Sequence, residues 1–162
     1  MEQQKNSKGF SLVELLIVVA ILGIIAAIAI PNLLASKRAA NDGSAIASMR
    51  TIHSAQATYR STAGAGEYAN LVDLMNEKMV DSSIGSGNKS GYTFNCPDSH
   101  LLAGPPATYF ATAIPTHTAL LQRTGYRSFT VTEDGRLRGK LTDTAAANHS
   151  EAKDNAVWPV LN

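Results

Sequence analysis

One carboxylate lies at the start of a long apolar segment of this chain. Glu14 is the only ionisable residue in the range 10–35, and no side chain in the range 15–31 is charged or forms hydrogen bonds. A charged residue in a membrane helix costs about 2.5 to 3.5 kcal/mol at its centre, so it usually has a partner or a function. Glu14 could equally lie near the lipid headgroups and stabilise the positive end of its helix by about 0.3 to 1 kcal/mol. The residues alone leave both interpretations open.

The apolar segment that follows Glu14 is long enough to cross a membrane. A helix rises 1.5 Å per residue, and about 20 apolar residues cross the hydrocarbon core of a bilayer, a length that the range 10–34 reaches. A secretory signal has a shorter apolar region, of about 7 to 15 residues. We therefore expect the segment to stay in the mature protein as a single membrane pass. The short, mildly basic range 1–9 favours a cytoplasmic amino terminus.

The sequence around Glu14 resembles the amino terminus of type IV pilins and pseudopilins. The resemblance covers residues 8–14, Lys-Gly-Phe-Ser-Leu-Val-Glu, and the apolar run that follows as far as Pro31-Asn-Leu. It implies that a prepilin peptidase cuts after Gly9 and that Phe10 becomes the N-methylated first residue. It also implies that Glu14 pairs with the new amino terminus of a neighbouring subunit. Because an unpaired buried charge is expensive, this pairing would disfavour wrongly inserted subunits.

The apolar helix has a second implied use, as the core of a filament. Its apolar residues leave no polar face, which suits membrane lipid first and other copies of the helix later. Pro31 removes a backbone donor and clashes with the carbonyl of Ala27, so we expect a kink there. In related filaments the region between the residues matching Gly23 and Pro31 loses helical order. The resemblance therefore implies that these two residues make the helix flexible.

The apolar residues beyond Pro31 follow a helical spacing that predicts packing on a globular domain. We expect one bent helix over 10–62, with its membrane or filament-core part at 10–34. The range 1–9 is then a leader peptide, and 63–162 is long enough for one small head domain. The apolar stripe consists of Ala35, Ala39, Ala45, Met49, Ile52 and Tyr59.

The head is expected to contain a small antiparallel sheet lying on the second half of the long helix, which gives an α+β fold, the pilin fold of the resemblance. Asn70 has the position of a cap for a short helix, and 82–91 is expected to be a loop. A turn at 133–135 joins two strands into a hairpin, with Leu137 and Leu141 on one side. Strands are predicted at 92–94, 108–114, 127–132 and 136–141.

The last residues of the chain follow a polar tail at 142–156. We expect Trp158 to anchor the end of the chain against the sheet, and the alternative is a surface role in adhesion or subunit contact. Basic residues of the head could hold DNA phosphates or lie on solvated strand faces. Because the formal net charge is only +1, specific nucleic-acid binding is not favoured. These basic residues are Arg123, Arg127, Arg136, Arg138 and Lys140.

The cysteine and histidine content does not favour an enzyme. Cys96 is the only cysteine, so no intrachain disulfide forms, unlike the two-cysteine loop of many type IV pilins. We expect Cys96 to be a small buried residue, with intermolecular pairing as the alternative. The four histidines lack a metal-ligand spacing, and no serine lies in a nucleophile-elbow motif. The sequence thus predicts no catalytic residue, no bound metal and no cofactor.

Three functions compete at this point. The first is a type IV pilus subunit, polymerised by an inner-membrane platform and a cytoplasmic ATPase for adhesion, twitching motility or DNA uptake. The second is a pseudopilin of a type II secretion system, in a periplasmic pseudopilus. The third is an anchored binding module that never polymerises, and it leaves Gly9, Phe10 and Glu14 unexplained. The calcium-binding loop of major pseudopilins is not evident, since Asp134, Asp143, Glu151 and Asp154 are scattered. We therefore favour the pilus subunit.

The first prediction concerns Glu14. The substitution Glu14→Ala leaves the cleavage site intact but removes the charge that would pair with a neighbour. We expect normal cleavage and poor assembly, measured as processed subunit in the membrane against sheared filament. Cleaved protein that still forms abundant filaments would count against this role.

Overall fold

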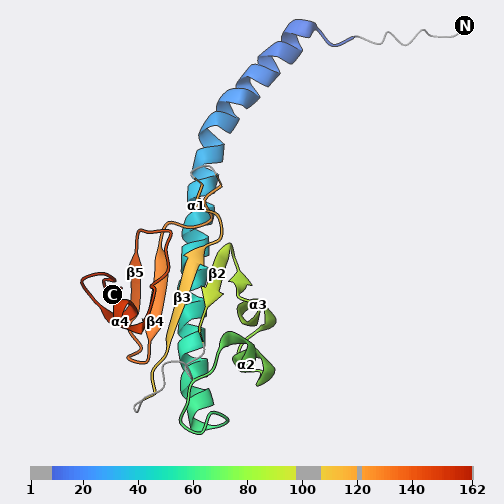
Figure 1. Ribbon diagram of the computed structural model, residues 1–162. Helices are drawn as coiled ribbons and strands as arrows, with labels where there is room; N and C mark the ends of the chain where they lie inside the picture. Colours follow the sequence, from blue (N-terminus) through green and yellow to red (C-terminus); the bar gives the residue numbers. More distant parts are fainter. Residues whose placement is uncertain (1–8, 98–106, 120–121, 162) are drawn as a thin grey trace, which may run out of the picture. The chain divides into compact units, whose positions relative to one another are not determined.

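The computed structural model describes residues 9–97, 107–119 and 122–161, and its secondary structure is α+β, as predicted. The chain forms two compact units, one up to Ser36 and one from Lys37 onward. The first unit contains the beginning of helix α1 (Leu12–Ser61), and the second contains the rest of α1 and every other element described (Figure 1). Of the leader predicted at 1–9, only Gly9 lies within the described residues.

Helix α1 is continuous through Pro31 and through the Asp42-Gly43 pair. Its carboxyl end is closed by backbone bonds, because the Gly64 N–H donates to the Tyr59 carbonyl at 2.8 Å and the Gly66 N–H to the Arg60 carbonyl at 3.0 Å. Gly66 has φ +100°, a conformation that glycine adopts at little cost. The kink expected at Pro31 stays a prediction.

The head contains a five-stranded antiparallel sheet in which each strand pairs with the next along the chain. Gly135, in the turn before the last strand, has φ +71° and confirms the predicted hairpin, whose register joins Val131 to Leu137. The strands are β1 (Asn88–Lys89), β2 (Tyr92–Asn95), β3 (Phe110–Pro115), β4 (Ser128–Thr132) and β5 (Leu137–Lys140).

The described part of the head also contains three short helices, each with a side-chain cap. Asn70 caps α2 (Leu71–Asn76) by accepting from the Asp73 N–H at 2.8 Å, as predicted. Asp81 caps α3 (Ser82–Gly85) in the same way. The prediction of a loop over 82–91 was therefore wrong, since that range contains α3 and β1. The polar tail also contains a helix that was not predicted, α4 (His149–Lys153), capped by Asn148.

The main core lies between one face of the sheet and the α1 residues beyond Lys37. Ala45, Met49 and Ile52 are fully buried there, as the apolar stripe predicted, and Cys96 is buried too. Ala35 and Ala39 are exposed, so the stripe was wrong at its beginning. The sheet contributes alternate residues to this core, which include Tyr92, Phe94, Ala111, Ala113, Phe129 and Val131.

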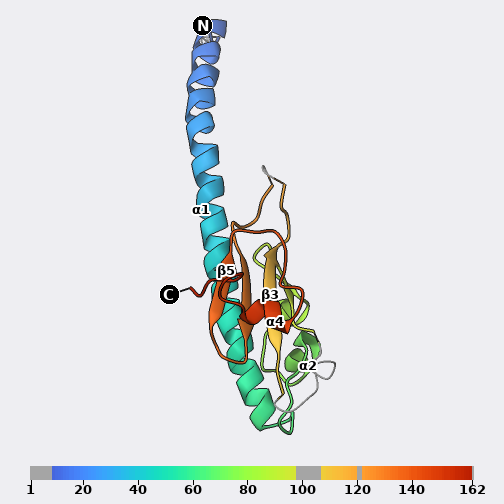
Figure 2. The same ribbon diagram turned by 60° about the vertical axis from the view of Figure 1, so that its left-hand side comes forward.

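The opposite face of the sheet is covered by the carboxy-terminal segment (Figure 2). Trp158 is 1% exposed and packs with Phe110, Ala146 and Ala152, which confirms it as the anchor of the chain end. Ser128, Thr130 and Thr132 point to this face and are fully buried. Leu141 was expected beside Leu137 but is 73% exposed, because β5 ends at Lys140.

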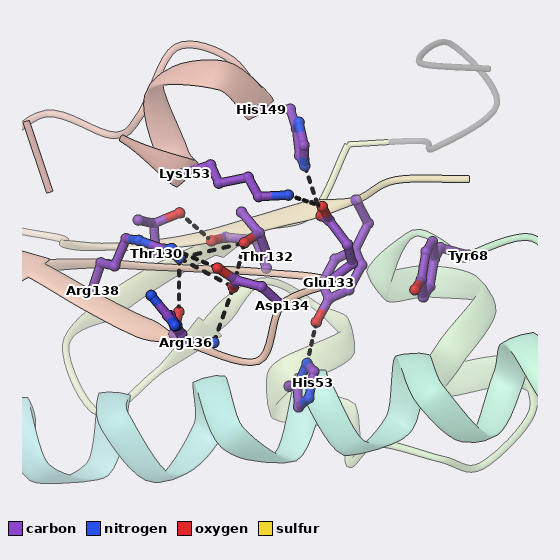
Figure 3. Close-up of polar contacts among 12 residues, drawn as sticks. His53, Tyr68, Thr130, Thr132, Glu133, Asp134, Arg136, Arg138, His149 and Lys153 are labelled. Carbon is purple, nitrogen blue, oxygen red and sulfur yellow. Dashed lines mark hydrogen bonds and ion pairs between the residues drawn. The ribbon is translucent and has the colours of Figure 1, made fainter. Parts of the chain in front are cut away.

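Arg138 is the central polar residue of the covered face, and it is 1% exposed rather than solvated (Figure 3). Its Nη1 donates to Asp134 Oδ1 at 3.2 Å, and its Nη2 to Asp134 Oδ2 at 2.5 Å. Its Nε donates to the Asn155 side chain at 2.9 Å. Burial alone would raise the pKa of Asp134, but the bonds from Arg138, Thr132 and the Arg136 backbone hold that pKa well below its usual range. The pair is therefore ionised at neutral pH.

A second ion-pair group holds α4 on the hairpin. Glu133 accepts from Lys153 Nζ at 2.7 Å and contacts His149 Nε2 at 2.6 Å. Burial alone would raise the pKa of Glu133, but these two hydrogen bonds hold it below its usual range. The polar tail is thus fixed to the sheet by charged groups of the β4–β5 turn.

Removing the Arg138 side chain tests how much this covered face depends on the ion pair. We expect Arg138→Met to lower the free energy of unfolding by about 2 to 4 kcal/mol, because Asp134 loses its partner. The exposed neighbour offers a control, and Arg136→Met should change stability by less than about 0.5 kcal/mol. Denaturant unfolding followed by Trp158 fluorescence measures both, since Trp158 is the only tryptophan. Equal stability of the two variants would contradict the role of the pair.

Candidate functional site

The expected cleavage site precedes the first residue of α1. Gly9 and Phe10 have no helical structure and are exposed, and Phe10 exposes 77% of its surface. Apart from its chain neighbours, no atom of the described residues lies within 4 Å of the position that a Cβ at Gly9 would occupy. The bond between these two residues is therefore outside the helix and open to a partner that binds an extended chain.

Glu14 has a bond within its own first turn that the sequence reasoning missed. The backbone N–H of Ser11 donates to Glu14 Oε2 at 3.0 Å, and the N–H of Leu15 donates to the Ser11 carbonyl at 3.2 Å. This is one half of a capping box, in which the residue at the third helical position reaches back to the cap. The pattern Ser-x-x-Glu before an apolar run was the signal that could have revealed it. One carboxylate oxygen thus stabilises the start of α1.

The beginning of α1 exposes apolar side chains on all sides. An 18-residue window has a mean hydropathy of 3.0 and is 0% buried, so by length and composition this helix could cross a membrane. An apolar surface of this extent indicates a lipid or protein partner. Among its most exposed large residues are Leu12, Leu22, Ile24, Ile28 and Leu33.

The two residues expected to make the helix flexible are both inside α1. Pro31 lies within the helix, and nothing stands within 4 Å of a Cβ added at Gly23. The structure brings no other predicted site residue to either of them. Their role in flexibility stays a prediction.

The second half of α1 is fixed to the head by a polar contact that the sequence reasoning also missed. Asp42 Oδ1 accepts from the Tyr92 hydroxyl at 2.7 Å and from the Tyr126 N–H at 3.0 Å. Asn41 donates to the Thr124 carbonyl at 2.7 Å. Burial and the Asp42 bond both raise the pKa of Tyr92, which therefore stays protonated and donates. An acid that interrupts an apolar stripe was the available signal.

Comparison with known proteins bears on the same amino-terminal residues. The family model described as the prokaryotic N-terminal methylation motif matches residues 4–30. The chain carries the amino-terminal motif of the type IV pilin and pseudopilin family. This match confirms the resemblance drawn from residues 8–14, and its range includes the expected cleavage position, Glu14 and most of the exposed apolar helix.

Similar proteins of both classes match this chain over part of its length. The type IV wide pilus major component PilA4 of Thermus thermophilus is 63% identical over 38 residues, 24% of this chain and 29% of that protein. The type IV major pilin protein PilA of Myxococcus xanthus is 34% identical over 88 residues, 54% of this chain and 36% of that protein. The type II secretion system core protein G of Aeromonas hydrophila is 33% identical over 58 residues, 36% of this chain and 41% of that protein. No solved structure is significantly similar.

The capping bond and the charge of Glu14 can be separated by one substitution. Glutamine also completes a capping box, so Glu14→Gln should keep the Ser11 N–H bonded while removing the charge. We expect slow hydrogen exchange at the Ser11 amide in detergent micelles for wild type and for Glu14→Gln. Exchange should be faster by about two- to fivefold in Glu14→Ala, since a capping bond stabilises by roughly 0.5 to 1 kcal/mol. Equal exchange in all three proteins would contradict the capping role.

Proposed function

We propose that this chain is a structural subunit of a type IV pilus. It is made as a membrane prepilin, cut between Gly9 and Phe10, methylated on the Phe10 nitrogen and polymerised into a helical filament. The observation that carries the proposal is the exposed apolar part of α1, which contains one carboxylate and follows an accessible Gly9-Phe10 bond. Adhesion, twitching motility and DNA uptake are the purposes that such a filament would serve.

The physical basis of assembly is an exchange of one apolar environment for another. In the membrane, lipid covers the apolar part of α1, and in the filament neighbouring copies of the same helix cover it. Cleavage creates a free amine on Phe10, and an α-amino group with a pKa of about 8 is mostly protonated at neutral pH. Glu14 Oε2 remains on the Ser11 N–H, which leaves Oε1 for the amine of the neighbouring subunit. A copy inserted out of register leaves both charges unpaired.

Three partners follow from this proposal besides other copies of the chain. A prepilin peptidase cuts the precursor, whose residues 1–9 form a leader on the cytoplasmic side of the bacterial inner membrane. A membrane platform, driven indirectly by a cytoplasmic ATPase, adds the mature chain to the filament. Residues 10–62 then supply the helix, and residues 63–162 form the head on the cell-surface filament.

A pseudopilin of a type II secretion system is the second candidate, because two core G proteins of such systems are similar to this chain. The four acidic residues considered above for a calcium site each bond within the head. Asp134 pairs with Arg138, and Asp143 pairs with Arg123. Glu151 accepts from the Ala147 N–H, and Asp154 from the Ala156 N–H. These contacts favour the pilus subunit.

Electron microscopy and mass spectrometry of sheared surface filaments test the proposal together. We expect long fibres whose subunit begins at Phe10 and carries one methyl group on its nitrogen. Among the described residues outside its chain neighbours, nothing lies within 4 Å of a Cβ added at Gly9, so Gly9→Val should fold normally and fail only in the peptidase. That variant should accumulate uncut in the membrane without fibres. Fibres that lack this chain, or native protein that begins before Gly9, would contradict the proposal.

A further inference from the structure

A cavity of about 520 Å³ opens between α1 and the β4–β5 hairpin. Helix α1 contributes Arg50 and His53 to its wall, and the hairpin contributes Arg136. Its apolar wall is formed by Leu137, Val160 and Leu161. The His53 ring is held in place by a 2.6 Å contact between its Nδ1 and the Tyr109 hydroxyl. The cavity therefore combines a fixed apolar wall with positively charged groups.

The two arginines of this cavity are not neutralised within the head. Both are exposed, and among the described residues no carboxylate pairs with Arg50 or Arg136. Arg123 and Arg138, in contrast, each pair with an aspartate. Two unpaired guanidinium groups beside one cavity attract carboxylates, which they can bind through two parallel hydrogen bonds.

Helix α2 presents a surface of the opposite character. Val72 is 51% exposed, although it lies on a helix whose neighbours Leu71 and Leu74 are buried. Asp73 lies in α2 and Glu77 is its C-cap, and their spacing of four residues places them on the same face of the helix. Among the described residues, neither carboxylate forms an ion pair. Val72 is thus complementary to the apolar wall of the cavity, and the two carboxylates are complementary to its two arginines.

The two surfaces lie at opposite edges of the sheet. Helix α2 contacts α3, which contacts β1, and β1 and β5 are the two edge strands of the sheet (Figure 1). The cavity adjoins β5, because Leu137 lines it. A contact between two different surfaces of identical subunits is heterologous, and it forms an open helix when the rotation does not close a ring. Complementary charges at opposite edges are the arrangement that such a contact needs.

We propose that the cavity receives helix α2 of a second copy of this chain. Asp73 and Glu77 of that copy pair with Arg50 and Arg136, and Val72 covers the apolar wall at Val160. This inference rests on the proposed filament and names a contact between heads in it. Its charges are only partly shielded from water, so raising the salt concentration weakens the contact.

Charge reversal with rescue tests this contact in cells that express the full chain. Like charges at an interface repel, so Arg136→Glu and Glu77→Arg should each reduce sheared filament by about tenfold or more. Combining both restores an opposite pair and should return the yield to within about threefold of wild type. Arg127→Glu is the matched control, because Arg127 is exposed but does not line this cavity, and it should assemble normally.

The level of cleaved subunit in the membrane shows whether each variant folds. Wild-type filaments with normal assembly of both single variants would overturn the contact and leave the proposed function intact. Stable single variants that fail, together with a double variant that also fails, would overturn it as well. Absence of wild-type filaments would instead remove the proposed function.

A disulfide provides a second measurement that does not depend on charge. Ser54 lines the cavity and Asn76 lies on α2, and both are exposed. In the proposed contact, Ser54 of one copy lies close to Asn76 of the next. The double variant Ser54→Cys with Asn76→Cys should therefore cross-link when assembled filaments are oxidised. We expect a ladder of covalent oligomers. Ser54→Cys with His117→Cys is the control and should remain monomeric. The buried Cys96 is present in both variants, so it does not account for a difference between them. Assembled filaments of the test variant that yield only monomers would overturn the contact.

Discussion

The uncovered apolar surface of α1 is the constraint on which the rest of this protein depends. Water cannot solvate its first half without a large free-energy cost, so lipid or other protein must cover it. Glu14, the one carboxylate of this first half, already accepts a hydrogen bond from the Ser11 N–H. One oxygen of Glu14 thus caps the helix. In the proposed filament, its charge would pair with the amino terminus of a neighbouring subunit.

The core of the head is formed by residues other than that apolar helix surface. Its core uses the second part of α1, where Met49 and Ile52 pack on the sheet and Asp42 bonds to Tyr92 and Tyr126. No intrachain disulfide contributes, because Cys96 is the single cysteine of the sequence. The carboxy-terminal segment is fixed by Trp158 and by the ion pairs around Arg138 and Glu133. Folding of the head and assembly of the helix can thus be separated by mutation.

Local patterns allowed much of the fold to be predicted. The apolar run, the Asn70 cap and the turn at Gly135 each depend on neighbouring residues, so the long helix, α2 and the β4–β5 hairpin were found. What depends on distant residues was missed or wrong. Arg138 was expected either to hold DNA phosphates or to lie on a solvated strand face, yet it is buried beneath the chain end. Ala35 was assigned to the buried stripe because it has the right spacing, but it is exposed. Where burial of the stripe begins is set by the position of the head along α1, which the spacing does not contain.

The candidate site shows the same division. Glu14 and the Gly9-Phe10 bond could be found because their motif is contiguous, whereas the cavity beside Arg50 and Arg136 joins three separate parts of the chain.

An electron cryomicroscopy structure of the assembled filament tests the central claim most directly. The account predicts that residues 12–30 of neighbouring copies pack against one another, with Glu14 within about 4 Å of a neighbour's Phe10 nitrogen. A filament in which these helices are solvated or Glu14 faces no amine would contradict it.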